Sequence, residues 1–327
     1  MKKNICTQAL ITLFLSCFSS SFGAFAQVSA TYPDKPIKII VSFTASGTTD
    51  ILAREVSNQL SIKWKVPVIV ENKAGAAGNL GTETVGHAPA DGYTLLASSI
   101  GPVSINPTLF KSLAVNPQVS LQPIAMLGEI PSVLVVPSTI DVNNWKDFVQ
   151  YTKANSDNLN YSSTGIGTAA HLVGYLFAHK THMNATHIPY KGAEATRDLV
   201  AGRISFMFAT APSVIPLIKA GQLIPVAVSS KKRMSTLPNV PTLGEVGVDL
   251  TTSTWFGLFG PSGMSPSLTK KINEAVVQIL TSSDVKSKLN DLGVDPIAMT
   301  SAEFTKYVRD DYSMWAPIVK ASGAKPE

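Results

Sequence analysis

Short apolar runs alternate with helical stretches between residues 37 and 97. The first run is rich in β-branched residues, which is typical of a buried strand, and the predicted strands cover 37–43, 66–70 and 93–97. Between the first two runs, Leu52, Val56 and Leu60 recur at helical spacing, so we expect a helix there. Because strands and helices alternate, this part of the chain predicts a parallel, doubly wound sheet.

The same alternation recurs beyond residue 130. Asn144 can cap a helix that carries Phe148, and Thr168, Leu172 and Leu176 predict the apolar stripe of another helix. We therefore expect a second α/β unit, in which the predicted strands cover 133–136, 159–162, 187–190, 204–208 and 224–229.

The chain after residue 260 is predicted to be mainly helical. Ser265 and Pro266 suit the N-cap and first positions of a helix, and Thr300 with Glu303 has the spacing of a capping box. The apolar run 256–259 predicts a strand that returns the chain to the first unit. We therefore expect a discontinuous lobe 1, residues 32–128 and 254–327, and a continuous lobe 2, residues 129–253.

Residues 1–26 have the three parts of a secretory signal peptide. Lys2 and Lys3 are followed by the apolar run 9–18, which is shorter than the ~20 residues that a membrane-spanning helix needs. Small residues then end at Ala26, where we expect cleavage and export to the periplasm. Two alternatives stay open: lipoprotein processing at Cys17, where the preceding residues match a lipobox poorly, and a buried N-terminal helix.

Length, cysteines and charge narrow the class of protein. A chain of 327 residues favours two lobes over one core. Both cysteines, Cys6 and Cys17, lie in the predicted signal peptide, so the mature chain has no thiol for a disulfide or a metal. Loss of Lys2 and Lys3 lowers the formal net charge from +5 to +3. The remaining basic residues are scattered, which argues against nucleic acid as a partner.

Motifs for catalysis or metal binding are weak. The sequence has no G-x-S-x-G nucleophile elbow, and its glycine-rich segments lack the lysine of a phosphate loop and the third glycine of a dinucleotide fingerprint. Ser163 and His171 could be imagined as nucleophile and base, but nothing in the sequence places an acid behind the histidine. His179 and His182 lack the carboxylate or cysteine support of a metal site. We expect no enzyme activity, no cofactor and no metal.

Two turns rich in glycine, serine and threonine, 43–49 and 163–168, each follow a predicted strand and precede a predicted helix. Helix N-termini expose unpaired N–H groups and carry partial positive charge, so such a turn can bind a carboxylate or phosphate. Since ligands of open α/β sheets lie at the carboxyl ends of the strands, we expect the turns to form two walls of a closing cleft. The alternative is that both are only tight turns with capping residues. Asp50 is expected to accept backbone N–H bonds in the first helical turn.

Seven ordered motifs run through nearly the whole mature chain. They are YPDKPI at 32–37, ENKAGAAG at 71–78, DGYTLL at 91–96, GIGTAAHL at 165–172, PYKG at 189–192, LPNVPT at 237–242 and WFGL at 255–258. With these motifs the chain resembles the Bug family, the periplasmic receptors of tripartite tricarboxylate transporters. The resemblance implies a type II periplasmic-binding-protein fold, with two doubly wound lobes and a ligand cleft between them. It also implies a carboxylate ligand that is held largely by backbone amides and ordered water, and delivery to membrane permease subunits.

Carried onto this chain, the resemblance and the two turns predict one set of ligand-binding residues. Phe43 would pack on the carbon skeleton of the ligand, and hydroxyl or backbone groups would donate to its carboxylate. The predicted residues are Phe43, Ala45, Ser46, Gly47, Thr48, Asp50, Ser98, Ser99, Ser163, Thr164, Gly165, Gly167, Thr168, His171, Ala209 and Thr210.

Some residues depart from the family pattern. Ser42 and Ser46 stand where proline and glycine are usual, and Tyr175 replaces a common glutamate. The segment after Gly192 is about one residue shorter than usual. These departures leave the fold intact but leave the identity of the carboxylate open. A monomer is the default for such a receptor, and a role as a ligand sensor for a kinase, or as a secreted hydrolase, stays an alternative.

Overall fold

A computed structural model describes residues 32–45, 47–190 and 194–326. The predicted signal peptide, Ser46 and residues 191–193 lie outside the described residues. Pro33–Glu327 forms one compact unit. Within the described part of the chain, no helix combines the length and the apolar character needed to cross a bilayer.

The first sheet confirms the predicted parallel core. Strand β1 pairs in parallel with β2 and with β3, and β9 joins β3 in the antiparallel sense. Strand β4 then pairs with β9 along most of its length. The strands of this sheet are β1 (Ile37–Val41), β2 (Val68–Asn72), β3 (Thr94–Ser99), β9 (Ser253–Pro261) and β4 (Leu121–Pro137).

The second sheet shares β4 with the first. Strand β5 pairs in parallel with β6 and β7, while β4 runs antiparallel to β7 and to β8. These strands are β5 (Leu159–Ser163), β6 (Ala185–Pro189), β7 (Phe206–Thr210) and β8 (Leu223–Val228).

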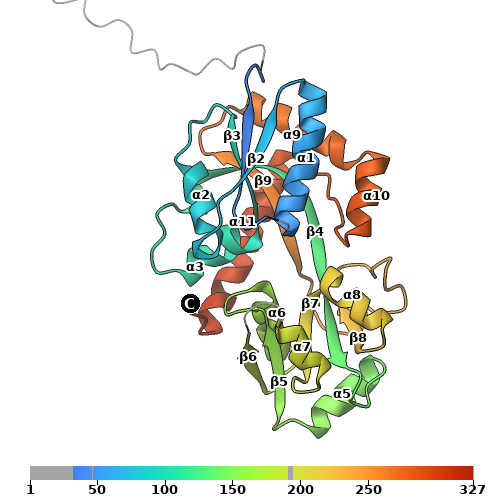
Figure 1. Cartoon of the computed structure of the whole chain (residues 1–327). Coiled ribbons are helices and arrows are strands. Elements are labelled where there is room, and N and C mark those ends of the chain that lie inside the picture. Colours follow the sequence, from blue (N-terminus) through green and yellow to red (C-terminus); the bar gives the residue numbers. More distant parts are fainter. Residues whose placement is uncertain (1–31, 46, 191–193, 327) are drawn as a thin grey trace, which may run out of the picture. The chain divides into compact units, whose positions relative to one another are not determined.

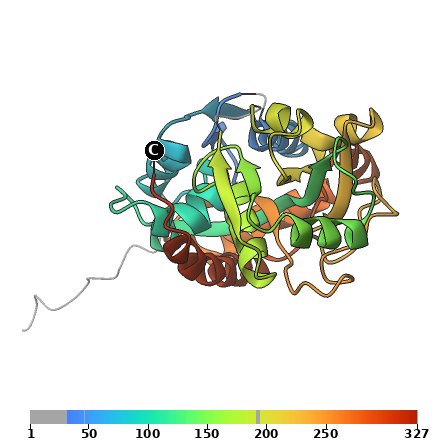
Figure 2. The same cartoon turned by 90° about the horizontal axis from the view of Figure 1, so that it is seen from below.

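Helices cover both faces of the strands (Figures 1 and 2). The helices before β4 are α1 (Thr48–Trp64), η1 (Ala76–Gly78), α2 (Asn79–Gly86), η2 (Gly101–Ile105), α3 (Asn106–Leu109) and α4 (Pro117–Ser120). Those between β4 and β9 are α5 (Trp145–Ala154), α6 (Ala169–Lys180), α7 (Glu194–Val200) and α8 (Ala211–Lys219). After β9 come α9 (Pro266–Leu280), α10 (Ser283–Asp291) and α11 (Ser301–Ala321).

Helix starts follow the predicted capping residues. The side chain of Asn144 accepts from the backbone N–H of Asp147 at the start of α5, and Ser265 caps α9 in the same way, with Pro266 in the first turn. Thr300 and Glu303 form a complete capping box at the start of α11. These capping predictions are therefore confirmed. Each capping side chain satisfies N–H groups that a helix cannot pair internally.

The strand predicted at 133–136 is the end of a much longer one. Strand β4 covers 17 residues and pairs with β9, β7 and β8. Its register shifts next to Ile124 and Leu127, and Gly128 has a φ of +159° with Val294 close by. The predicted lobe boundaries at 128/129 and 253/254 fall within β4 and β9, and they stay a prediction.

Two aromatic clusters anchor the sheets. Trp255 of β9 packs against Phe304 with ring centroids 5.9 Å apart, and Phe148 of α5 lies 5.9 Å from Phe206 of β7. Burying such rings is among the largest contributions to core stability. The carboxyl ends of β1, β3, β5 and β7 are thereby fixed, and the predicted ligand loops follow these ends.

Candidate ligand-binding site

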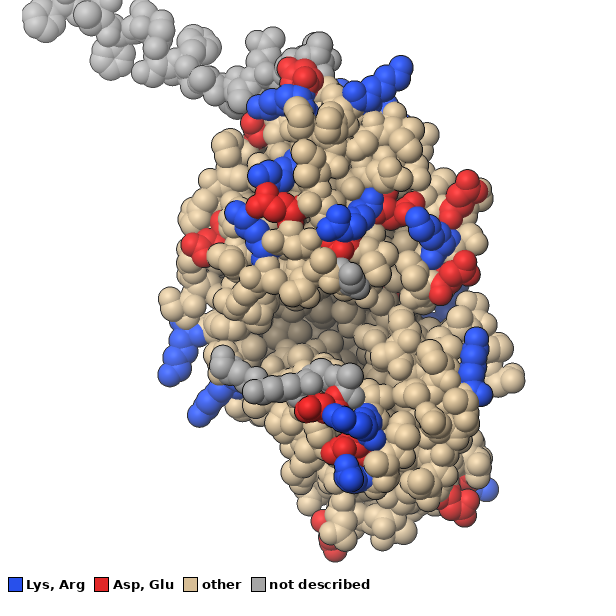
Figure 3. Space-filling model, in the orientation of Figure 1, with Lys and Arg blue, Asp and Glu red and all other residues tan. Residues whose placement is uncertain are grey.

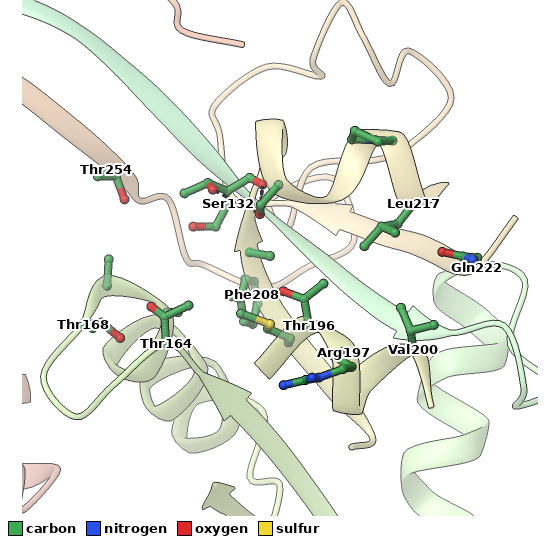
Figure 4. A pocket seen from close by; sticks show the side chains of 17 residues that line it. Ser132, Thr164, Thr168, Thr196, Arg197, Val200, Phe208, Leu217, Gln222 and Thr254 are labelled. Atoms are coloured by element: carbon green, nitrogen blue, oxygen red, sulfur yellow. Dashed lines mark hydrogen bonds between the residues drawn. The ribbon is translucent and has the colours of Figure 1, made fainter. Parts of the chain in front are cut away.

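A cavity of about 810 Å³ lies beside the carboxyl end of β7. Figure 4 shows Thr164, Thr168 and Thr254 at one end of it and Leu217 and Gln222 at the other. The described residues that line it are Ser132, Thr164, Thr168, Ala169, Ala170, Thr196, Arg197, Val200, Met207, Phe208, Ala209, Thr210, Ser213, Pro216, Leu217, Gln222 and Thr254.

Arg197 is the one charged residue in this lining. Its side chain is 72% exposed, and its guanidinium lies 3.7 Å from the carboxylate of Glu194. The cavity therefore has a mildly positive rim and, among its lining residues, no carboxylate. Figure 3 likewise shows a surface hollow whose visible wall is almost entirely uncharged, with acidic and basic side chains gathered above and below it.

The loop between β5 and α6 is held by hydrogen bonds within itself. The Thr168 hydroxyl donates to the carbonyl of Gly165 at 2.7 Å and accepts from the backbone N–H of His171 at 3.4 Å. Ser163 Oγ accepts from the N–H of Gly165 at 3.2 Å. Gly165 and Gly167 have φ of +146° and +76°, which favour glycine. The loop is thus a rigid cap on the start of α6.

The stacked imidazole rings of His171 and His187 hold this loop by hydrogen bonds. His171 Nδ1 accepts from the N–H of Gly167 at 3.0 Å, and His187 Nε2 lies 2.8 Å from Ser163 Oγ. The ring centroids of the two histidines are 3.8 Å apart. Burial lowers the pKa of both rings to about 4, with the neighbouring imidazole as a further cause for His187. Both rings are therefore neutral at pH 7.

The groups that this loop turns toward the cavity are Thr164 and the first turn of α6. Thr164 is exposed, and Ala169 and Ala170, the first two residues of α6, line the cavity. Their N–H groups belong to the first turn, where an α-helix offers no internal partner. Both alanines lie within the ligand loop 163–171 that the family resemblance implies, but they are not among the individually predicted residues, although their position directly after the capping Thr168 could have indicated them.

The start of α8 lies at the same cavity. Thr210 is its N-cap residue and gives it no side-chain cap hydrogen bond. The Ser213 hydroxyl donates to the carbonyl of Thr210 at 2.7 Å and accepts from the Thr210 hydroxyl at 3.2 Å. The starts of α6 and α8 therefore both lie at one cavity, although Pro212 in the first turn of α8 has no N–H to donate.

The first loop, after β1, is built around buried polar contacts. Ser42 Oγ and Ser98 Oγ are 3.1 Å apart, and the carbonyl of Phe43 accepts from the amide of Asn72 at 3.0 Å. Gly47 is the N-cap of α1 and supplies no side-chain hydrogen bond to it. The start of α1 is consequently left open beside Phe43 and Ala45, which are half-buried and exposed.

Asp50 is buried in the first turn of α1, and polar side chains hold its carboxylate. Asn72 donates to it at 2.8 Å and Arg54 at 2.9 Å, while a second Arg54 nitrogen donates to Asn72 at 3.0 Å. The negative charge of Asp50 is thus balanced by Arg54 within the first lobe. The ion pair has the i, i+4 spacing of neighbours on a helix, whereas the contact with Asn72 could not be inferred from the local pattern, because Asn72 is 22 positions away in the chain.

The predicted residues fall into three groups. Four line the cavity: Thr164, Thr168, Ala209 and Thr210. Others support the loops beneath: Asp50, Ser98, Ser163, Gly165, Gly167 and His171. Among the described residues, Phe43, Ala45, Gly47, Thr48 and Ser99 lie at strand ends or in the first loop and do not line this cavity. Ser46 lies outside the described residues.

Ser163 contacts the ring of His187, whereas the sequence analysis considered His171 for such a pair. Ser163 is fully buried. In the described part of the chain, no cluster of three or more His, Cys, Asp or Glu residues could hold a metal ion.

Comparisons with known proteins agree on one family. The sequence pattern of the tripartite tricarboxylate transporter family receptor matches residues 52–324. Protein BugT of Bordetella pertussis is 32% identical over 95% of this chain and 97% of its own length.

Solved structures give the same result. An R. palustris protein with adipate is 29% identical, with a TM-score of 0.77 over 90% of this chain and 100% of that one. MatC from Rhodopseudomonas palustris, with bound malate, is 28% identical, with a TM-score of 0.72 over 88% and 100%. The predicted two-lobed binding fold is confirmed by these likenesses, and the chain belongs to the family of tripartite tricarboxylate transporter receptors.

Proposed function

We propose that this protein is a periplasmic receptor that captures a small organic carboxylate and delivers it to the permease subunits of a tripartite tricarboxylate transporter. The observation that carries the proposal is the composition of the cavity. The starts of two helices and threonine hydroxyls line it, and among the described lining residues the single charged one is the cation Arg197.

Electrostatics favour an anion over a neutral or cationic ligand in this cavity. The first-turn N–H groups of α6 and α8 carry partial positive charge, and they can bind a carboxylate without a fixed cation beside it. Arg197 adds a weaker contribution from the exposed rim. Asp50 does not oppose it, because its charge is balanced by Arg54.

Relatives support a carboxylate in particular. The two structural neighbours named above hold adipate and malate, both organic carboxylates. The family description supports a transporter as the destination. The signal-peptide pattern of residues 1–26 supports a periplasmic location.

The contacts of Ser163 argue for a receptor rather than a hydrolase. Its hydroxyl is fully buried and hydrogen-bonded to Gly165, outside the lining of the cavity. His187 beside it has no carboxylate partner among the described contacts. A nucleophile needs both an oriented base and access to the substrate.

The proposal is tested by calorimetry and thermal-shift measurements on the purified mature protein. Each carboxylate is paired with the amide of the same carbon skeleton, for example adipate with adipamide and benzoate with benzamide. We expect saturable binding of at least one acid and no binding of its amide. Failure of all acids, or equal binding of the amides, would contradict the proposal.

A matched pair of variants tests the rim. Arg197→Gln should weaken acid binding several-fold, because one attractive charge is lost from a partly solvated site. Arg309→Gln, on the exposed surface of α11, is the control and should bind as the wild type does. Equal affinities in both variants would remove Arg197 from the site.

A further inference from the structure

The wall of the cavity changes character along its length. At one end lie Thr164, Thr168 and the start of α6, which are polar (Figure 4). At the other end lie Val200 of α7 and Leu217 of α8, which are both partly exposed (Figure 4). Phe208 of β7 belongs to the lining but is fully buried. A ligand that fills this cavity therefore meets hydrogen-bond donors at one end and the aliphatic side chains of Val200 and Leu217 at the other.

Among the described lining residues, the apolar part has no strong partner for a second anionic group. Gln222, at the far end, is neutral and exposed. Arg197 is already 3.7 Å from Glu194 and mostly in solvent. A second carboxylate placed beside Val200 and Leu217 would lose its hydration without recovering it from the protein, which is costly.

The volume also favours a ligand with a substantial body. A cavity of about 810 Å³ lies in the upper part of the roughly 300–1,000 Å³ range of sites that hold drug-sized molecules. Such sites are mainly apolar, with few polar groups that fix orientation. A short, highly hydroxylated acid would leave the apolar wall in contact with water.

We propose that the preferred ligand is a monocarboxylate with an extended alkyl or aryl body, its acid group at the start of α6 and its apolar body along Val200 and Leu217. This inference rests on the proposed carboxylate-binding function and adds the chemical class of the ligand.

The first test is a series of acids that share one head group. Affinity should rise from butyrate through hexanoate to octanoate by about four-fold for each buried methylene. Octanoate should also bind more tightly than suberate, which has the same carbon count and a second acid group. Tighter binding of suberate, malate or citrate than of octanoate would overturn the inference while leaving the proposed function intact. Binding of no acid at all would overturn the proposed function itself.

The second test uses the same substitution at two sites. Val200→Gln should weaken octanoate binding by at least about ten-fold, since it replaces apolar wall with an amide, and should change butyrate binding less than two-fold. Val119→Gln is the control, because Val119 is 70% exposed on α4 and away from the cavity. If both variants bind octanoate as the wild type does, Val200 does not contact the ligand body and the inference fails.

Discussion

His171 and His187 connect the shape of the α6 loop to protonation. His171 must be neutral to accept from Gly167, since a protonated ring has no acceptor. The depressed pKa of about 4 keeps both rings in that form down to mildly acidic pH. The same nitrogen that fixes the loop thus makes the loop sensitive to acid.

These histidines predict a pH dependence of stability. Their pKa in the folded protein lies below the ordinary value of about 6.5, so the unfolded chain binds more protons between pH 4 and 6.5. The free energy of unfolding should therefore fall as pH decreases through this window, by up to about 1.4 kcal/mol per pH unit for each ring. Urea unfolding at several pH values measures it. His171→Asn should reduce the slope, and the exposed-site control His87→Asn should not.

Asp311 contributes with the opposite sign. Its carboxylate accepts from the indole N–H groups of Trp255 at 2.9 Å and Trp315 at 3.2 Å, and burial raises its pKa to about 6. The folded state then binds the extra proton between about pH 4 and 6, so this group stabilises the fold at low pH and loses that contribution as pH rises through 6.

Replacing Asp311 by Asn should make the pH dependence steeper. The amide cannot accept from both indoles, so stability at neutral pH should fall by about 1–3 kcal/mol. Because the opposing titration is removed, the remaining increase in stability between pH 4 and 6 should exceed that of the wild type. An unchanged slope in the same urea experiment would show that Asp311 does not titrate in this range.

Among the elements, the loop ahead of α6 is tightly constrained by packing. Gly167 has a φ of +76°, and a Cβ built on it would lie 2.5 Å from Leu109 Cδ2 of α3. The loop of the second sheet therefore packs directly on a helix that precedes β4. Any side chain here must move either the loop or α3.

Gly167→Ala should lower the free energy of unfolding by more than backbone strain alone would. Left-handed backbone costs a non-glycine residue about 1–2 kcal/mol, and overpacking against Leu109 adds about 1–3 kcal/mol. Gly221→Ala isolates the first effect, because Gly221 has a φ of +68° and open space around it. Thermal unfolding should show a larger loss for Gly167→Ala, and calorimetry should show weaker ligand binding for that variant alone. Equal losses in both would mean that Leu109 gives way without cost.

Local signals in the sequence predicted most elements, and distant contacts explain the rest. Asn144, Ser265 and Thr300 cap helices as expected because capping involves neighbours three residues away. The length of β4 was missed because Pro123 and Gly128 resemble breaks, and its partner β9 is far away in the chain.

The candidate site was predictable where the chain itself brings its groups together. Thr164 and Thr168 were found from the turn between β5 and α6, whereas Arg197 and Leu217 were not. Arg197 lies exposed on a helix, and no motif in the neighbouring sequence indicates that it binds a ligand. Its approach to the cavity depends on how α7 packs beside β7.

Across the two sheets, binding is expected to change the distance between lobes. Only a closed arrangement lets one anion contact donors from both predicted loops, so the ligand should shift the population toward it. Lys153 of α5 and Lys286 of α10 are exposed and belong to the predicted lobe 2 and lobe 1, respectively. Since Cys6 and Cys17 lie within the predicted signal peptide, cysteines placed at these two positions would be the only ones in the mature protein.

Spin labels at Lys153→Cys and Lys286→Cys measure this distance directly. Saturating carboxylate should shorten and narrow the distance distribution, whereas the matching amide should leave it unchanged. Labels at Lys286→Cys and Lys63→Cys, both in the predicted lobe 1, provide the control and should not respond. A distribution that ignores the ligand would mean that capture occurs without closure.

The shared strand β4 limits where the chain can be cut into separately expressed fragments. One end of β4 pairs with β9 and the other with β7 and β8. A fragment cut at residue 128 would leave each half with a bare strand margin of unpaired amides and carbonyls, which invites aggregation. Strand β4 therefore has to stay together with β9, β7 and β8, and neither half of the chain can do this. A biosensor built from this receptor is better assembled from the uncut chain.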